Sequence, residues 1–292
     1  MINPDTLEFP ADGLVDATWL LARLGTPGLA VLDGSWHLPT AQRNPRAEFA
    51  AEQIPGAQFF DLDALSDPDS PLPHMLPSAI AFAAGIGALG ISSSDSVVVY
   101  DTVGIFSSAR VWWMFKAFGH DRVAVLDGGL PAWKAAGGPT SAGNTSSPTP
   151  GQFDAEFRPA AVRNAEEVTY ALRSGAAQVV DVRGRGRFIG TQPEPRPGLR
   201  AGHMPGAVNL PFTDLLDSET GQMLPVDALV RRFAAAGLTE GPLISSCGSG
   251  VTACVAALAA TRMGWGDIAV YDGSWAEWGS RDDLPVINGP ET

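Results

Sequence analysis

LISSCGSGVTACVAALAATRMG (residues 243–264) contains a short apolar run, a glycine-rich loop and a long apolar run in succession. The run 243–246 has the length and composition of a strand that is buried on both faces of a parallel sheet. The run 251–263 is long enough to form a helix. The segment therefore predicts a strand, the loop CGSGVT and a helix, with Cys247 as the first residue after the strand.

The position of Cys247 favours chemical reactivity. Open α/β sheets place their sites at the carboxyl ends of strands, where Cys247 stands. Gly248 and Gly250 allow the backbone to curl, so that several N–H groups point inward and form an anion-binding nest. The positive end of the helix that starts at Val251 adds to this field, which favours the thiolate over the thiol. Cys254 lies among Val and Ala in the helix pattern, which is typical of a small core residue.

The chain contains one unit twice. Four short matches recur in the same order at an offset of about 145 to 150 residues, which indicates a duplication. They pair AVLDG (30–34) with VVDVR (179–183), IPGA (54–57) with MPGA (204–207), VVVYD (97–101) with LISSC (243–247), and LDGGLPAW (126–133) with YDGSWAEW (271–278). The third pair places Asp101 opposite Cys247. The second half carries roughly eleven extra residues, which lie within IGTQPEPRPGLRAGH (189–203).

Short apolar runs alternate with segments of helical length in both halves. The predicted strands are 30–33, 97–100, 123–126, 179–182, 243–246 and 268–271, and the predicted helices are 78–89, 107–118, 164–174, 226–236 and 251–263. This alternation predicts an α/β fold with a mainly parallel sheet flanked by helices in each half. The segment GGPTSAGNTSSPTPGQ (137–152) has the composition of a linker. We therefore predict an N-terminal domain over 1–140, a linker over 141–155 and a C-terminal domain over 156–292.

Composition and charge argue against several classes of protein. The chain has 19 Lys and Arg against 32 Asp and Glu, a net charge of −13, so no general affinity for nucleic acid or anionic membranes is expected. Two cysteines cannot build a disulfide framework, and four scattered histidines lack metal-ligand spacing. No apolar run approaches ~18 residues, and the N-terminus has neither a signal nor a transit pattern. We expect a protein of a reducing compartment, most simply the cytoplasm.

The loop CGSGVT resembles the active-site loop of the 3-mercaptopyruvate sulfurtransferase family, within the rhodanese superfamily. The likeness extends over SPLPHMLP (70–77), SSARVWWMFKAFGH (107–120), LDGGLPAW (126–133) and EPRPGLRAGHMPGAVNLPF (194–212). It implies two tandem rhodanese-like domains, of which only the second holds the reactive cysteine. It also implies that Cys247 takes sulfur from 3-mercaptopyruvate as a persulfide and releases pyruvate. The acceptor would be a thiol such as thioredoxin, or cyanide, and no cofactor or metal is implied.

A group of arginines lies between residues 183 and 200, comprising Arg183, Arg185, Arg187, Arg196 and Arg200. Arginine binds carboxylates through a planar fork of two N–H groups. By resemblance, Arg187 and Arg196 form the pair that binds the substrate carboxylate. Arg196 lies in the insertion that the first half lacks, which suits a site present only in the second half. The other three arginines are predicted to lie at the surface or to have structural roles.

The resemblance assigns roles to further residues. Ser249 matches a loop serine that orients the substrate or delivers a proton. His74 and Asp63 match residues that the first domain contributes to catalysis. The other loop residues predicted to bind substrate are Gly248, Gly250, Val251 and Thr252.

Four other functions are compatible with parts of the pattern. A thiosulfate:cyanide sulfurtransferase is the nearest alternative, but that branch carries two basic residues after its cysteine, where this chain has Gly248 and Ser249. A Cys-dependent phosphatase needs Cys-x5-Arg, and Ala253 stands at the arginine position. A non-catalytic binding module fits the half that contains Asp101. A papain-like hydrolase would need a histidine base, for which His203 is the candidate in the second half.

Overall fold

The computed structural model describes residue 7 and the ranges 9–143 and 148–289. The chain packs as two compact units, and the main division falls between Arg158 and Pro159. Two short segments depart from a sequential division, because Asp69–Met75 belongs to the second unit and Ser218–Met223 to the first. Residues 144–147 of the predicted linker lie outside the described residues.

The first unit is built on a parallel sheet. Within the described residues its strands are β1 (Leu14–Val15), β2 (Leu29–Asp33), β3 (Gln58–Phe59), β4 (Ser96–Tyr100) and β5 (Val123–Leu126), in the spatial order β1-β5-β4-β2-β3. Its helices are α1 (Ala17–Leu21), α2 (Pro45–Ala51), α3 (Ala79–Ala88), α4 (Ser108–Ala117) and α5 (Gly129–Ala135), with a 3-10 turn at Pro39–Ala41. Every strand pair is parallel.

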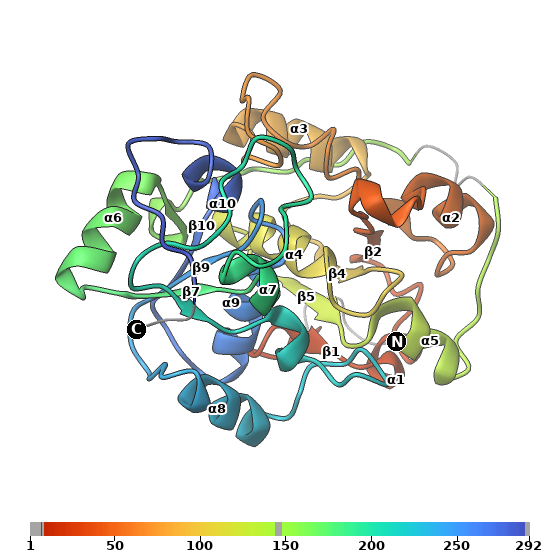
Figure 1. Cartoon of the computed structure of the whole chain (residues 1–292). Helices are drawn as coiled ribbons and strands as arrows, with labels where there is room; N and C mark the ends of the chain where they lie inside the picture. Colours follow the sequence, from red (N-terminus) through yellow and green to blue (C-terminus); the bar gives the residue numbers. More distant parts are fainter. Residues whose placement is uncertain (1–6, 8, 144–147, 290–292) are drawn as a thin grey trace. The chain divides into compact units, whose positions relative to one another are not determined.

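The second unit repeats this arrangement. Its described strands are β6 (Val162–Arg163), β7 (Gln178–Asp181), β8 (Val208–Asn209), β9 (Leu243–Ser246) and β10 (Ile268–Tyr271), in the order β6-β10-β9-β7-β8. Its helices are α6 (Ala165–Ser174), α7 (Arg185–Phe188), α8 (Val226–Ala235), α9 (Ala253–Arg262) and α10 (Ser274–Trp278), with 3-10 turns at Pro159–Ala161 and Phe212–Leu215. In Figure 1 the strands β7, β9 and β10 lie between α6 and α8.

The architecture confirms the predicted α/β fold and its duplication. All six predicted strands and all five predicted helices are present, each close to its expected bounds. The capping pair of Asn164 and Glu167 starts α6, with each side chain bonded to the other residue's backbone N–H. The sequence pattern missed the two-residue edge strands and the short helices, including α7 and α10. Elements of this length are too short to show a hydrophobic period.

The core of the second unit explains why its central strands are buried on both faces. Side chains of a strand alternate between the two faces of a sheet. Val179, Ile244 and Tyr271 face one way and form a cluster with residues of α6, α7 and α10. Helix α9, whose residues lie outside this cluster, packs against β9 and β10. Among the described residues, no helix has the length and apolar character needed to cross a membrane.

Equivalent strand ends in the two units carry the same carboxylate in different surroundings. Asp181, at the end of β7, is fully buried and bonds the Arg183 guanidinium at 2.7 Å. Asp33, at the end of β2, is equally buried, but Ser35 stands where the second unit has Arg183. Burial raises the pKa of Asp33 to about 6, although the Ser35 N–H donates to its carboxylate at 2.9 Å. Among the described residues no cation pairs with Asp33, so its charge at neutral pH is unmatched.

We predict that Asp33→Asn stabilises the chain more at high pH than at low pH. The raised pKa means that folding favours protonated Asp33, and this contribution is lost as the pH rises through about 6. A shift of this size corresponds to about 3 kcal/mol above both pKa values. Urea unfolding of both proteins should therefore show the advantage of the variant growing by about 2 kcal/mol between about pH 4 and about pH 8. An advantage independent of pH would contradict the assignment.

Candidate active site

Cys247 is the first residue after β9 and is 2% exposed. The loop that follows it leads directly into α9, which begins at Ala253. Gly250 adopts a left-handed backbone conformation with φ 75°, which turns the chain back towards the helix. The predicted strand, loop and helix are all present, and the cysteine lies at the carboxyl edge of the sheet.

Backbone N–H groups of α10 hold the loop in place by donating hydrogen bonds to the loop's carbonyl groups. The N–H of Trp275 donates to the carbonyl oxygen of Cys247 at 3.0 Å, and the N–H of Ala276 donates to that of Gly248 at 2.9 Å. In a planar trans peptide the C=O and the following N–H point in opposite directions. The N–H groups of Gly248 and Ser249 therefore point away from α10.

The loop offers several uncommitted donors. Within the described residues, the backbone N–H groups of Gly248, Ser249, Val251 and Thr252 have no hydrogen-bond acceptor. Donors of this kind next to a buried sulfur can bind negative charge. The Gly250 N–H donates to the Ser274 hydroxyl at 3.1 Å. Gly250 therefore gives the loop its curvature while its N–H is directed at Ser274.

The matching loop of the first unit binds an anion of its own. Asp101 is fully buried, and one oxygen of its carboxylate accepts the N–H of Val103 at 3.0 Å. The other oxygen accepts the N–H groups of Phe106 at 2.7 Å and Ser108 at 3.0 Å, and the Ser108 hydroxyl at 2.7 Å. The loop after the equivalent strand thus closes around a carboxylate. This loop fold accommodates one negative group, which is the Asp101 carboxylate in the first unit. Cys247 takes the matching position in the second unit.

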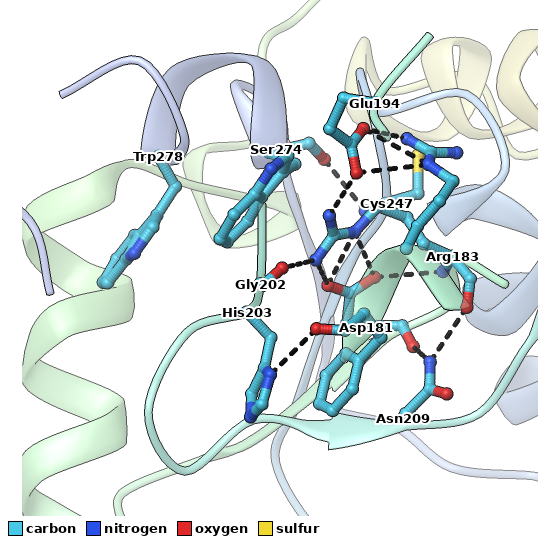
Figure 2. Close-up of polar contacts among 12 residues, drawn as sticks. Asp181, Arg183, Glu194, Gly202, His203, Asn209, Cys247, Ser274 and Trp278 are labelled. Atoms are coloured by element: carbon cyan, nitrogen blue, oxygen red, sulfur yellow. Dashed lines mark hydrogen bonds and ion pairs between the residues drawn. The ribbon is translucent and has the colours of Figure 1, made fainter. Parts of the chain in front are cut away.

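A buried chain of alternating charges lies beside the cysteine. Asp181 binds Arg183 at 2.7 Å, and Arg183 binds Glu194 at 2.7 Å. The Glu194 carboxylate in turn accepts hydrogen bonds from Arg187, at 2.5 Å from Nη2 and at 3.2 Å from Nε. Figure 2 shows the Arg183 guanidinium between the carboxylates of Asp181 and Glu194. The side chain of Glu194 is 3% exposed and that of Arg187 is 21% exposed, so the outer end of the chain of charges is the accessible one.

The geometry leaves part of Arg187 available. Glu194 takes the edge formed by Nε and Nη2, and Nη1 has no hydrogen-bond partner among the described residues. A guanidinium has five donors, so the end formed by the two Nη atoms can still bind a carboxylate. The same guanidinium lies next to the cysteine loop, because a Cβ atom on Gly248 would be 2.9 Å from Nη2 of Arg187. Gly248 thus provides space for an arginine.

The other arginines of the patch differ from Arg187. Arg183 is buried within the chain of charges, and its Cζ lies 4.1 Å from the ring centre of Trp275. Arg185 is exposed. Arg200 has a structural role, because it donates to the carbonyl oxygens of Gly279, Leu284, Trp278 and Arg281. Arg196 is half-buried and follows Glu194 by two residues in the inserted segment.

One of the two residues predicted from the first half of the sequence lies at the loop. His74 belongs to the segment that packs with the second unit, and its Nδ1 lies 3.1 Å from the Ser249 hydroxyl. Its backbone is left-handed, with φ 62°. Asp63 lies in the first unit, where the Nε1–H of Trp36 donates to its carboxylate at 3.3 Å.

Two further residues have structural surroundings. The Nδ1 of His203 lies 2.9 Å from the carbonyl oxygen of Phe188, and the two rings stack with centres 3.8 Å apart. This environment holds His203 in the core and does not favour the papain-like alternative. The Cys254 thiol is fully buried and donates to the Gly250 carbonyl oxygen at 3.2 Å.

Comparison with known proteins agrees with the duplicated fold. The rhodanese-like domain family matches the chain twice, over residues 16–136 and 164–281. The chain belongs to the rhodanese-like family. The 3-mercaptopyruvate sulfurtransferase of Homo sapiens is 46% identical over 92% of this chain and 92% of its own length. Thiosulfate/3-mercaptopyruvate sulfurtransferase 1 of Arabidopsis thaliana, a mitochondrial protein, is 44% identical over 94% of this chain and 78% of its own.

A solved structure extends this likeness to three dimensions. SseA, a 3-mercaptopyruvate sulfotransferase of Escherichia coli, is 38% identical to this chain with a TM-score of 0.82. The alignment covers 90% of this chain and 98% of SseA. The resemblance of the CGSGVT loop therefore extends to the whole fold.

Sequence reasoning missed two residues of the site. Glu194 holds Arg187, and Ser274 holds the loop of Cys247. Glu194 occurs in the inserted segment together with Arg196, so the position of the insertion was a signal for it. Ser274 stands opposite Gly129 in the repeat, and this difference between the halves was also visible.

We predict that Glu194→Gln lowers the free energy of unfolding by about 3 kcal/mol, because it removes the charged partner of Arg187 and one of the two charged partners of the buried Arg183. Asp227→Asn is the matched control. Asp227 pairs with Arg231 at 2.8 Å on the surface of α8, where both side chains are about 70% exposed, and exposed pairs contribute roughly 0–1 kcal/mol. Urea unfolding of the full chain compares the two variants. Equal losses would show that Glu194 contributes no more than a surface carboxylate.

Proposed function

We propose that this chain is a 3-mercaptopyruvate sulfurtransferase in which Cys247 carries the transferred sulfur as a persulfide. The observation that carries the proposal is the loop after β9, where a buried cysteine is followed by four backbone N–H groups that have no acceptor among the described residues. Relatives named for this activity, among them those of Homo sapiens and Escherichia coli, match more than nine tenths of the chain, 92% and 93%.

The reaction begins when the Cys247 thiolate attacks the sulfur of the substrate. An S–S bond forms while the C–S bond of 3-mercaptopyruvate breaks, and the electron pair of that bond remains on the departing carbon as the enolate of pyruvate. A proton converts the enolate to pyruvate, and Cys247 is left as a persulfide. The thiolate of an acceptor then attacks the outer sulfur and returns Cys247 to its thiolate form.

The loop amides stabilise the negative sulfur in both forms. The N–H groups of Gly248, Ser249, Val251 and Thr252 are held in place by the loop's own folding, so they need no rearrangement when charge reaches the outer sulfur. Such preorganised donors are most effective where water is excluded, and Cys247 is 2% exposed. The amides therefore replace a basic side chain as the support for the thiolate.

Arg187 binds the carboxylate of the substrate. Its open Nη end faces away from Glu194, while Glu194 fixes the plane of its guanidinium. Because Arg187 lies against Gly248, a carboxylate bound there places the rest of a small substrate close to the loop. Arg196 is the second arm of this fork. Arg187 and Arg196 thus orient the substrate sulfur towards Cys247.

Ser249 and His74 deliver the proton to the enolate. The Ser249 hydroxyl lies in the loop itself, and His74 Nδ1 is 3.1 Å from it. A hydroxyl between an imidazole and the reacting carbon can pass a proton in one step and recover it from the imidazole. By resemblance, Asp63 is the third residue of this proposal, as a carboxylate that the first domain contributes to catalysis.

Thiosulfate is the second candidate donor, because a relative from Arabidopsis thaliana bears both substrates in its name. Thiosulfate carries two negative charges on a small molecule and favours cations directly beside the loop. This loop has Gly248 and Ser249 there, and the nearby cation Arg187 is already paired with Glu194. We therefore propose 3-mercaptopyruvate as the preferred donor, with a thiol such as thioredoxin, or cyanide, as acceptor. A reducing compartment such as the cytoplasm suits the reactive thiol.

We predict that Cys247→Ser abolishes sulfur transfer and leaves the fold intact, because a hydroxyl cannot store sulfur as a persulfide. Cys254→Ser, the matched control, should keep most of the activity, since Cys254 is a core residue bonded to Gly250. Mass spectrometry of donor-treated protein should find one added sulfur atom on Cys247. Sulfur on Cys254, or turnover by Cys247→Ser, would refute the proposal.

We also predict that Gly248→Arg lowers kcat/KM for 3-mercaptopyruvate by about tenfold or more and raises the relative use of thiosulfate. The new guanidinium would occupy the space of Arg187 and repel it; two unit charges ~4 Å apart interact by about 4 kcal/mol at an effective dielectric of 20. Gly248→Ala is the steric control, because it crowds Arg187 without adding charge. If both variants keep the wild-type donor ratio, the position of Arg187 does not determine donor choice.

A further inference from the structure

The segment YDGSWAEW (271–278) contains a serine that the proposed chemistry has not used. Ser274 is fully buried at the start of α10. Its hydroxyl accepts the N–H of Cys247 at 3.1 Å and the N–H of Gly250 at 3.1 Å, and it donates to the carbonyl oxygen of Tyr271 at 2.8 Å. A serine hydroxyl has one donor and two acceptor positions. All three are therefore used, and two of them hold the loop of Cys247.

The backbone of Ser274 has a strained conformation, which costs conformational free energy. Its φ is 49°, in the left-handed region that favours glycine. Among the described residues the non-glycine residues with positive φ are Gln42, His74 and Ser274, and the last two contact the loop of Cys247. A side chain in this conformation costs roughly 1–2 kcal/mol. Glycine would avoid the cost, so the presence of serine points to a use for the hydroxyl.

The repeat provides an internal comparison. Gly129 stands at the matching position of the first unit, with φ 57°. A Cβ atom there would lie 2.3 Å from the carbonyl oxygen of Asp101 and 2.6 Å from that of Gly104. In the first unit this position therefore meets carbonyl oxygens and has no room for a side chain. In the second unit the same position meets N–H groups of the loop, and a hydroxyl accepts them.

We propose that Ser274 is a positioning residue for sulfur transfer, because its hydroxyl binds two loop amides and so directs the remaining amides towards the sulfur of Cys247. The N–H groups of Cys247 and Gly250 mark the two ends of the turn that contains Gly248 and Ser249. With both ends held by one oxygen atom, the peptides between them cannot rotate independently. Trp275 and Ala276 complete the hold by binding the carbonyl groups of Cys247 and Gly248.

This inference rests on the proposed persulfide chemistry and makes a separate prediction about kinetics. Ser274 holds the two ends of the turn that presents amides to the sulfur, whereas the substrate carboxylate is assigned to Arg187. Loss of the hydroxyl should therefore lower kcat and leave KM nearly unchanged. Removing one preorganised donor from an enzyme costs about 100- to 1000-fold in kcat. For loosened donors we expect a loss of about tenfold or more.

Two variants separate the hydroxyl from the backbone conformation. Ser274→Gly removes the hydroxyl and allows φ 49° without strain, while Ser274→Ala removes the hydroxyl and retains the strain. Both should lower kcat for 3-mercaptopyruvate by about tenfold or more, with KM within about twofold of wild type. Ser280→Ala is the control, since Ser280 is an exposed serine near the same helix whose hydroxyl bonds the Glu277 carbonyl oxygen at 2.8 Å. It should keep wild-type values.

The experiment measures steady-state kinetics, thermal unfolding and alkylation of Cys247 by iodoacetamide near pH 7. Because iodoacetamide reacts with the thiolate, alkylation should slow in both Ser274 variants. Wild-type kcat in Ser274→Gly, or a loss confined to KM, would overturn the role of Ser274. If Ser274→Ala fails to fold, Ser274→Gly alone decides. A wild-type chain that transfers no sulfur would instead overturn the proposed function, and this role with it.

Discussion

The carbonyl groups of Cys247 and Gly248 accept hydrogen bonds from the first turn of α10, and the chemistry of the second unit depends on this pair of bonds. The C=O and N–H of a planar trans peptide point in opposite directions, so a hydrogen bond that fixes the C=O also fixes the direction of the N–H. The loop N–H groups on that side form no backbone hydrogen bonds among the described residues and remain available next to the sulfur. Burial then makes each of them more effective, because little water competes for the charge.

The two halves use one scaffold in opposite ways. In the first unit the Asp101 carboxylate occupies the loop and takes up its N–H groups. That loop is stable and closed, since its anion is part of the chain. In the second unit the N–H groups of Gly248, Ser249, Val251 and Thr252 have no acceptor within the part of the chain that the structure describes, and Ser274 binds the two amides at the ends of the turn. A duplicated fold can therefore retain its loop geometry while only one copy keeps room for a reacting sulfur.

Buried charges explain how a strongly acidic chain keeps a cation beside this loop. These charges alternate in sign, so Arg183 lies between the carboxylates of Asp181 and Glu194, and Glu194 also holds Arg187. Such a chain is worth little as a source of stability compared with an apolar core, but it holds its members in fixed geometry. Its last member is the least buried and lies against Gly248. The segment that supplies Glu194 and Arg196 has no counterpart in the first copy.

The sequence by itself determined the α/β class, the duplication, the central strands and the cysteine loop. These features are written in local patterns: apolar runs of strand length, a glycine-rich turn, and motifs that recur at one offset. Only the tertiary structure decided which N–H groups of the loop are free, that Glu194 holds Arg187, and that His74 and Ser274 both contact the loop. Such contacts join residues that are far apart along the chain, and their geometry depends on peptide orientation and burial, which no local pattern encodes.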